Sequence, residues 1–137
     1  MDDAKNGTDI KNWVELRHNC SPFDMFTRLR HGVEQDIATL VALLSDKRPA
    51  TEFKIIAESN FFAVTRQVAG EYAERSPWVQ FSWNNEGIRV KNFRGASEKA
   101  VLTLNDSGEC KLKLEDGKEL NCWQFRKRFL EDLFFNF

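Results

Sequence analysis

The chain has 137 residues, with 20 basic and 21 acidic side chains and a formal charge of -1. This length fits one domain that buries a core of its own. The near-neutral charge excludes a histone-like or strongly polybasic protein but not a local basic patch. No apolar run approaches the roughly 20 residues of a membrane-spanning helix, so we predict no membrane partner.

The N-terminal segment is polar. Residues 1–8 are expected to be flexible, and residues 1–12 lack the pattern of a secretory signal. A short helix is predicted after them, because Ile10, Trp13 and Arg17 recur at helical spacing.

The chain has three cysteines, an odd count, and they lie far apart at Cys20, Cys110 and Cys122. This spacing argues against a disulfide framework and predicts a reducing, cytoplasmic location.

A long helix is predicted to begin at Ser21, which suits the N-cap, and Pro22 suits the first helical position. Apolar residues then repeat every three or four positions to Leu44, and the run Ser45–Pro49 ends the helix. Gly32 interrupts this stripe at a cost of about 1 kcal/mol relative to alanine.

The next segment allows two interpretations. Residues 53–57 have the composition of a strand, whereas the apolar residues between Phe53 and Tyr72 share one side of a helical wheel. We favour a second helix over roughly 50–75 and allow for a break in it near Ser59–Asn60, because both residues favour caps over helix interiors.

From Trp78 onward the hydrophobic period changes to two, and turn sequences recur at 84–87, 105–108 and 115–118. Asn121, with Gln124 three residues later, predicts a capping box at the start of a final helix. The expected fold is a single α+β domain over residues 1–137. It has two N-terminal helices, a four-stranded antiparallel meander sheet and a C-terminal helix packed on the sheet.

The alternation assigns each strand residue to one of two faces. The apolar set is expected to face the helices: Val79, Phe81, Trp83, Ile88, Val90, Leu102, Leu104, Cys110, Leu112 and Leu114. The opposite face then carries Trp78, Gln80, Ser82, Arg89, Lys91, Phe93, Thr103, Lys111 and Lys113.

This second face combines basic side chains with aromatic rings, and it has three alternative interpretations. It could be a protein contact surface, since tryptophan and arginine anchor many interfaces. It could hold single-stranded nucleic acid, with rings stacking on bases and cations tracking phosphates. It could also be an ordinary solvated sheet face. We predict a protein partner that contacts Trp78, Arg89, Lys91, Phe93, Lys111 and Lys113.

The C-terminus is unusually apolar, ending Leu133-Phe134-Phe135-Asn136-Phe137. Exposing several phenylalanines would forfeit roughly 1.5–3 kcal/mol each and favour aggregation. The tail therefore either folds into its own core or completes an interface. We predict that Phe135 and Phe137 contact a second copy of the chain in a homodimer.

Catalytic and cofactor signatures are scarce. His18, His31 and the cysteines match no zinc spacing, so no metal or cofactor is predicted. Cys122 follows a helix cap, where thiols can be reactive, but core packing is the better interpretation. His31 with Glu34 or Gln35 could form an acid–base pair, but a single histidine on the side of a helix is more often simply exposed. A third functional alternative is a small-molecule pocket between helices and sheet, lined by Trp83, Phe81, Phe61 and Phe62. We expect a non-enzymatic interaction protein of adaptor, inhibitor or regulatory type.

Overall fold

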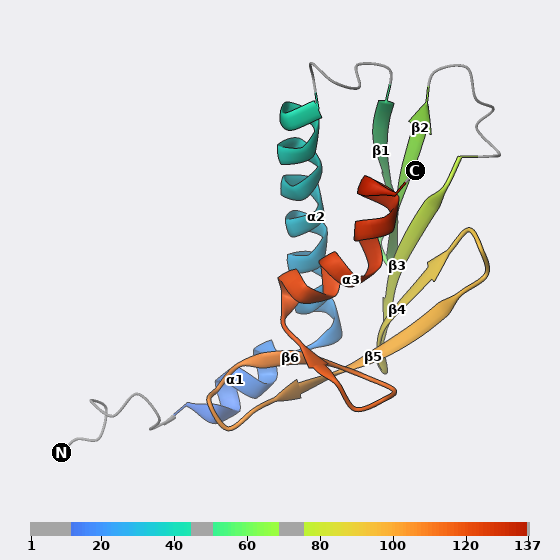
Figure 1. The fold of residues 1–137 in the computed structure, drawn as a ribbon. Helices are drawn as coiled ribbons and strands as arrows, with labels where there is room; N and C mark the ends of the chain where they lie inside the picture. Colours follow the sequence, from blue (N-terminus) through green and yellow to red (C-terminus); the bar gives the residue numbers. More distant parts are fainter. Residues whose placement is uncertain (1–11, 45–50, 69–75, 137) are drawn as a thin grey trace.

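The computed structural model describes residues 12–44, 51–68 and 76–136 of the chain. One antiparallel sheet carries the long helices α2 and α3 against a single face, and α1 lies beside the end of the sheet that holds β5 and β6 (Figure 1). The elements in chain order are α1 (Trp13–Asn19), α2 (Pro22–Leu44), β1 (Thr51–Ala57), β2 (Phe61–Val68), β3 (Trp78–Asn84), β4 (Gly87–Asn92), β5 (Ser97–Leu104), β6 (Cys110–Leu114), β7 (Glu119–Leu120) and α3 (Cys122–Phe135).

The sheet is a meander in which every strand pairs antiparallel with its neighbour in sequence, in the order β1 to β7. The α+β class and the antiparallel sheet are therefore confirmed. The expected number of four strands is wrong, because the described residues form a sheet of seven. Two of the additional strands, β1 and β2, form a hairpin that extends it beyond β3.

That hairpin occupies most of the segment for which we expected a second long helix, and this prediction is wrong for the described residues. Ser59 and Asn60 lie at its turn, where the Glu58 amide donates to the Phe61 carbonyl oxygen at 2.8 Å. Aromatic and β-branched residues fill both flanks and favour a pleated surface. The apparent helical stripe arose partly because Arg66 breaks the apolar alternation of β2. Residues 69–75 lie outside the described part.

Helix α2 begins as the sequence predicts. The Ser21 hydroxyl accepts from the Asp24 amide at 3.2 Å, which supplies one of the bonds that a helix start requires. Gly32 has a packing role, since a Cβ at this position would lie 2.6 Å from the guanidinium carbon of Arg126 on α3. The glycine thus leaves room for an arginine between the two helices.

Stacked aromatic rings form the centre of the core. Phe62 of β2 stacks on Phe81 of β3 with ring centroids 4.9 Å apart, and Phe26 of α2 packs on Phe62 at 5.3 Å. Helix α3 packs on the same cluster, with Phe125 6.3 Å from Phe81 between ring centroids. The helix starts with the predicted capping box, in which Asn121 and Gln124 exchange hydrogen bonds of 3.0 Å. Packing between these aromatic rings therefore holds the helices against the sheet.

The structure contradicts one prediction about the cysteines. Cys20, at the junction of α1 and α2, forms a disulfide with Cys110 of β6, and Cys122 is the free thiol. The two partners are 90 residues apart in sequence and meet because the junction of α1 and α2 lies beside β5 and β6. Widely spaced cysteines can pair in a folded chain, so sequence spacing was a poor guide here.

The short helix α1 is confirmed over residues 13–19, and none of its residues is buried. Within the described ranges, no helix combines the length and the apolar character that a membrane crossing requires. The predicted flexibility of residues 1–8 concerns residues outside those ranges.

Candidate binding surface on the outer face of the sheet

The strand register divides the sheet into the two faces that the alternation predicts. Phe81 lies opposite Val90, and Leu102 lies opposite Leu112, on the face that packs against the helices. On the other face Arg89 lies opposite Lys99 of β5. Because side chains alternate along a strand, the Thr103–Lys111 pair four residues further along β5 shares this face.

The same reasoning places the other expected strand residues. Lys91 pairs with Gln80, and Lys113 pairs with Val101 of β5. Trp78 pairs with Thr65 of β2. The structure thus brings Trp78, Arg89, Lys91, Lys111 and Lys113 onto one face, hereafter the outer face.

No described element covers the outer face. The helices α2 and α3 lie against the opposite face (Figure 1), and of the outward residues described in β2 to β6 only Gly87, which has no side chain, is buried. Every side chain of the set therefore keeps some contact with solvent.

The outer face is larger than the sequence suggested. The hairpin β1–β2 adds Lys54, Ile56 and Phe61, whose register partners Thr65, Ala63 and Ser82 also point outward. Ile56 is well exposed. Sequence reasoning missed this extension because it assigned the segment to a helix, although the Ser59–Asn60 turn between β-branched runs was a usable signal.

Two bases of the outer face are engaged by nearby carboxylates. The Lys99 Nζ lies 2.6 Å from Oε1 of Glu86, in the β3–β4 turn. This hydrogen bond, followed by the charge of Lys99, lowers the pKa of the Glu86 carboxyl below its ordinary value of 4.5. The Lys111 Nζ lies 3.9 Å from Oε1 of Glu109, a weaker pairing.

The remaining bases are more available to a partner. Arg89 donates to the Ser97 hydroxyl at 3.2 Å, and no described carboxylate lies within ion-pair distance of it, although its charge adds a small contribution to the lowered pKa of Glu86. Among the described residues, no carboxylate lies within ion-pair distance of Lys91 or Lys113, and both are exposed. The outer face therefore carries at least three cations without a fixed counter-ion.

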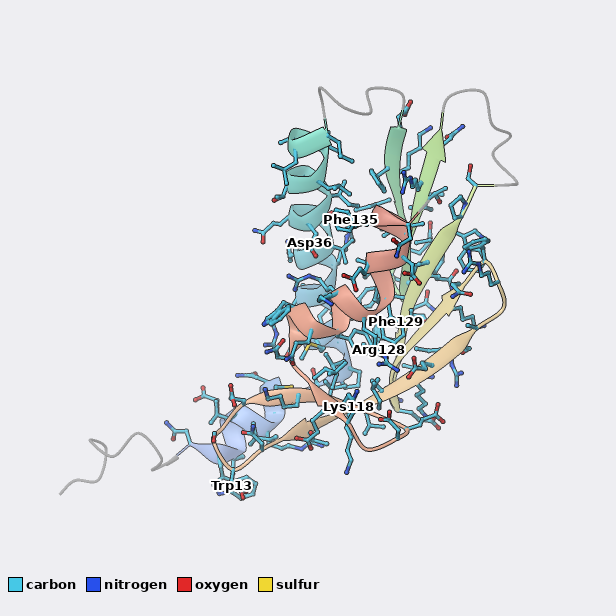
Figure 2. All side chains as sticks on the ribbon, viewed as in Figure 1. Trp13, Asp36, Lys118, Arg128, Phe129 and Phe135 are labelled. Atoms are coloured by element: carbon cyan, nitrogen blue, oxygen red, sulfur yellow. A yellow bond between two sulfur atoms is a disulfide. The ribbon has the colours of Figure 1, made fainter. Side chains whose placement is uncertain are left out.

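One acid of this region does not reduce the positive charge of the outer face. Glu98 pairs with Val90 in the register, so it points toward the helices. There its carboxylate accepts from the Arg128 guanidinium of α3 at 3.2 Å. Figure 2 shows Arg128 and Phe129 on the part of α3 that faces the sheet.

Phe93 lies just beyond the end of β4, in the turn that leads to β5. Its amide donates to the Trp78 carbonyl oxygen at 3.2 Å, which holds the turn beside the start of β3. The Arg94 guanidinium carbon lies 5.1 Å from the Phe93 ring centroid. The ring is therefore at the rim of the outer face rather than within a strand.

The two C-terminal residues of the predicted interface lie elsewhere. Phe135 is exposed near the end of α3, on the helical side of the molecule (Figure 2). Phe137 lies outside the described residues. Of the described tail residues, Leu133 and Phe134 are buried in the core, whereas Phe135 and Asn136 are exposed.

The side chains considered for catalysis or metal binding do not come together at one site. His31 is exposed, with Nδ1 3.8 Å from the Glu34 carboxylate. The Cys122 thiol accepts from Arg126 Nη1 at 3.2 Å and is partly packed against the core. Across the described ranges, no group of three or more potential metal ligands occurs.

The aromatic residues proposed for a small-molecule pocket take other positions. Phe62 and Phe81 are fully buried against each other, and Trp83 packs on Phe23 with centroids 5.4 Å apart. Phe61 belongs to the outer face. Phe62, Phe81 and Trp83 thus pack between the helices and the sheet, and Phe61 does not join them there.

No family model, no curated protein and no solved structure matches this chain.

Proposed function

We propose that this protein is a single α+β domain that acts by binding, and that its outer face contacts a partner protein bearing acidic groups. The observation that supports this is the uncovered sheet face on which Trp78 accompanies Arg89, Lys91 and Lys113. Tryptophan and arginine are the side chains that most often anchor interfaces. Unpaired cations would accelerate the encounter with an acidic surface and orient it.

Matched variants test this proposal. Lys91→Glu/Lys113→Glu reverses two bases of the outer face, and Arg30→Glu/Lys118→Glu makes the same charge change outside it. Proteins captured from the native host by the wild type are identified by mass spectrometry, then purified and titrated against each variant. We expect the outer-face variant to lose a partner that the control variant retains. Equal binding by both variants would remove the outer face from the proposal.

Single-stranded nucleic acid is the second candidate, favoured by one observation. Phe61 and Trp78 lie on the same face as the cations, which is the arrangement that stacking on bases requires. A fluorescently labelled mixed-sequence oligonucleotide tests this candidate by anisotropy. Binding at low salt that weakens steeply with added salt would support it, since phosphate contacts release counter-ions. Absence of binding at low salt would exclude it.

The cytoplasmic location and the homodimer are also proposals. The cytoplasmic location rested partly on the absence of disulfides, and the Cys20–Cys110 bridge removes that support, because disulfides persist mainly in oxidising compartments. The homodimer would use the helical side, where Phe135 is exposed.

A further inference from the structure

Helix α3 presents a stripe of four exposed side chains that the core does not use. Trp123, Lys127, Glu131 and Phe135 are spaced by four residues, so they follow one side of the helix. Their exposed fractions are 56%, 58%, 51% and 61%, so each keeps more than half of its surface in solvent. We call this set the α3 stripe.

The α3 stripe borders a groove of about 340 Å³ between α2 and α3. Leu40 and Leu43 of α2 line the groove from the other side, and Leu43 is well exposed. Figure 2 shows Asp36 on α2 and Phe135 on α3 along these two helices. Two exposed aromatic rings and an exposed leucine thus surround one concave surface, a combination typical of interaction sites.

The residue types along the α3 stripe are arranged so that two antiparallel copies of the stripe would complement each other. Read forward it is aromatic, base, acid, aromatic, and read backward it is aromatic, acid, base, aromatic. Two antiparallel copies related by a two-fold axis at the level of Phe129 would set Lys127 opposite Glu131 of the copy. The same axis would set Trp123 opposite Phe135 of the copy. A two-fold interface requires this self-complementarity.

From this pattern we infer that the α3 stripe binds a second copy of this chain, with the two α3 helices antiparallel. The charge order selects a second copy over an unrelated apolar partner, because one register satisfies both charges and both rings at once. The surface lies on the other side of the molecule from the outer face. The inference is therefore independent of the proposed partner.

The charges near the interface already have counter-ions in the single chain. Lys127 Nζ lies 3.1 Å from Glu131 Oε1 within the helix. Arg126 Nε, on the groove wall, lies 2.7 Å from Asp36 Oδ2 of α2. Dimerisation would convert two Lys127–Glu131 pairs into one array of four alternating charges. No charge would be buried alone, which is the main penalty for ionic groups at interfaces.

The stripe adds no buried residue to the core. Phe125, Leu130 and Leu133 attach α3 to the core from its other side and are almost fully buried. Changes at Lys127 and Glu131 should therefore alter association while leaving the structure of the single chain intact.

Charge exchange between two variants gives a decisive test. Lys127→Glu alone places acids opposite acids across the two-fold axis, and Glu131→Lys alone places bases opposite bases. We expect each variant to dimerise roughly tenfold more weakly than the wild type, measured by sedimentation velocity over a concentration series. An equimolar mixture of the two variants should recover the dimer, because each acid then faces a base. The double variant Lys127→Glu/Glu131→Lys should recover it as well.

Recovery on mixing cannot come from repair of a damaged helix, since each chain keeps its own substitution. Trp123→Ser/Phe135→Ser should also weaken the dimer, and Lys113→Glu on the outer face should leave it unchanged. Circular dichroism verifies that each variant is folded. A wild-type chain that stays monomeric at its highest soluble concentration would overturn the inference. So would a dimer that neither single variant weakens, or a mixture that gains no dimer over the separate variants.

Discussion

The guanidinium of Arg66 on β2 holds the end of α3, with Nη1 2.9 Å from the carbonyl oxygen of Leu133. A second bond of 3.2 Å joins the same nitrogen to the Phe134 carbonyl oxygen. Arg66 is only 2% exposed. The last carbonyl groups of a helix lack partners within the helix and carry partial negative charge, so a buried cation is well placed there. This contact fastens the apolar C-terminal tail to the sheet.

Replacement of Arg66 by methionine should therefore loosen the tail. The substitution keeps an unbranched apolar side chain but removes the guanidinium, so that two carbonyl groups lose their donor. We expect a loss of about 2 kcal/mol in the free energy of unfolding, measured by urea denaturation. Amide exchange near the end of α3 should rise first. Arg30→Met, which removes only an exposed contact of 3.6 Å with Glu34, is the control and should cost less than about 0.5 kcal/mol. Equal effects of the two substitutions would contradict this role of Arg66.

The disulfide should contribute substantially to stability, because Cys20 and Cys110 are 90 residues apart. Closing a long loop restricts the unfolded chain, which typically stabilises the native state by about 2–4 kcal/mol. Reduction should lower the thermal midpoint of the wild type but not of Cys20→Ser/Cys110→Ser. Peptide mapping under alkylating conditions should find Cys20 linked to Cys110 and Cys122 free. A wild-type midpoint that is insensitive to reductant, with the bridge present beforehand, would refute the contribution.

The ion pair between Glu86 and Lys99 predicts a specific pH response. The pKa of Glu86 is lowered below its ordinary value of 4.5, first by the hydrogen bond from Lys99 and then by its charge. The pair therefore contributes stability above about pH 4.5, and this contribution disappears as the pH falls through the lowered pKa. Carboxyl NMR titration should give a pKa under 4.5 in the wild type and a higher one in Lys99→Met. An identical titration in both proteins would show that Lys99 is not the cause.

The contact between Asp36 and Arg126 couples the two long helices. Partial burial by itself would lower the pKa of the Arg126 guanidinium, but the hydrogen bond and charge of Asp36 outweigh it and, with smaller contributions from Cys122, raise that pKa. A double-mutant cycle with Asp36→Asn and Arg126→Met should give a coupling of about 1 kcal/mol in unfolding free energy. The 2.7 Å contact between Asp36 and Arg126 predicts a stabilising coupling. Strictly additive effects of the two substitutions would exclude this coupling.

Local sequence signals were reliable where the residues needed for an element lie next to one another. The Ser21 cap, the Asn121–Gln124 capping box and the hairpin turns after Trp78 all appear in the structure as predicted. Each depends on hydrogen bonds that span a few residues. In the β5–β6 turn, for example, Asn105 Oδ1 accepts from the Ser107 amide at 2.9 Å.

The first hairpin shows where local reasoning failed. Ile55, Val64 and the residues around them fit a strand or one side of a helix equally well, because short apolar runs are compatible with both periods. Pairing with β3 removes this ambiguity, since Val64 lies opposite Val79 in the register. Arg66 obscured the strand alternation of β2 for a related reason. Its buried position depends on carbonyl groups of α3 far along the chain.

By itself the sequence determined the alternation from Trp78 onward, and with it the gathering of Arg89, Lys91, Lys111 and Lys113 on one face. Strand geometry has a period of two residues, so the order of side chains is sufficient to separate the faces. The tertiary structure alone decided the seven-stranded sheet, the Cys20–Cys110 bridge and the exposed stripe of α3. Each of these depends on which distant segments meet, and that is set by the packing of the whole core.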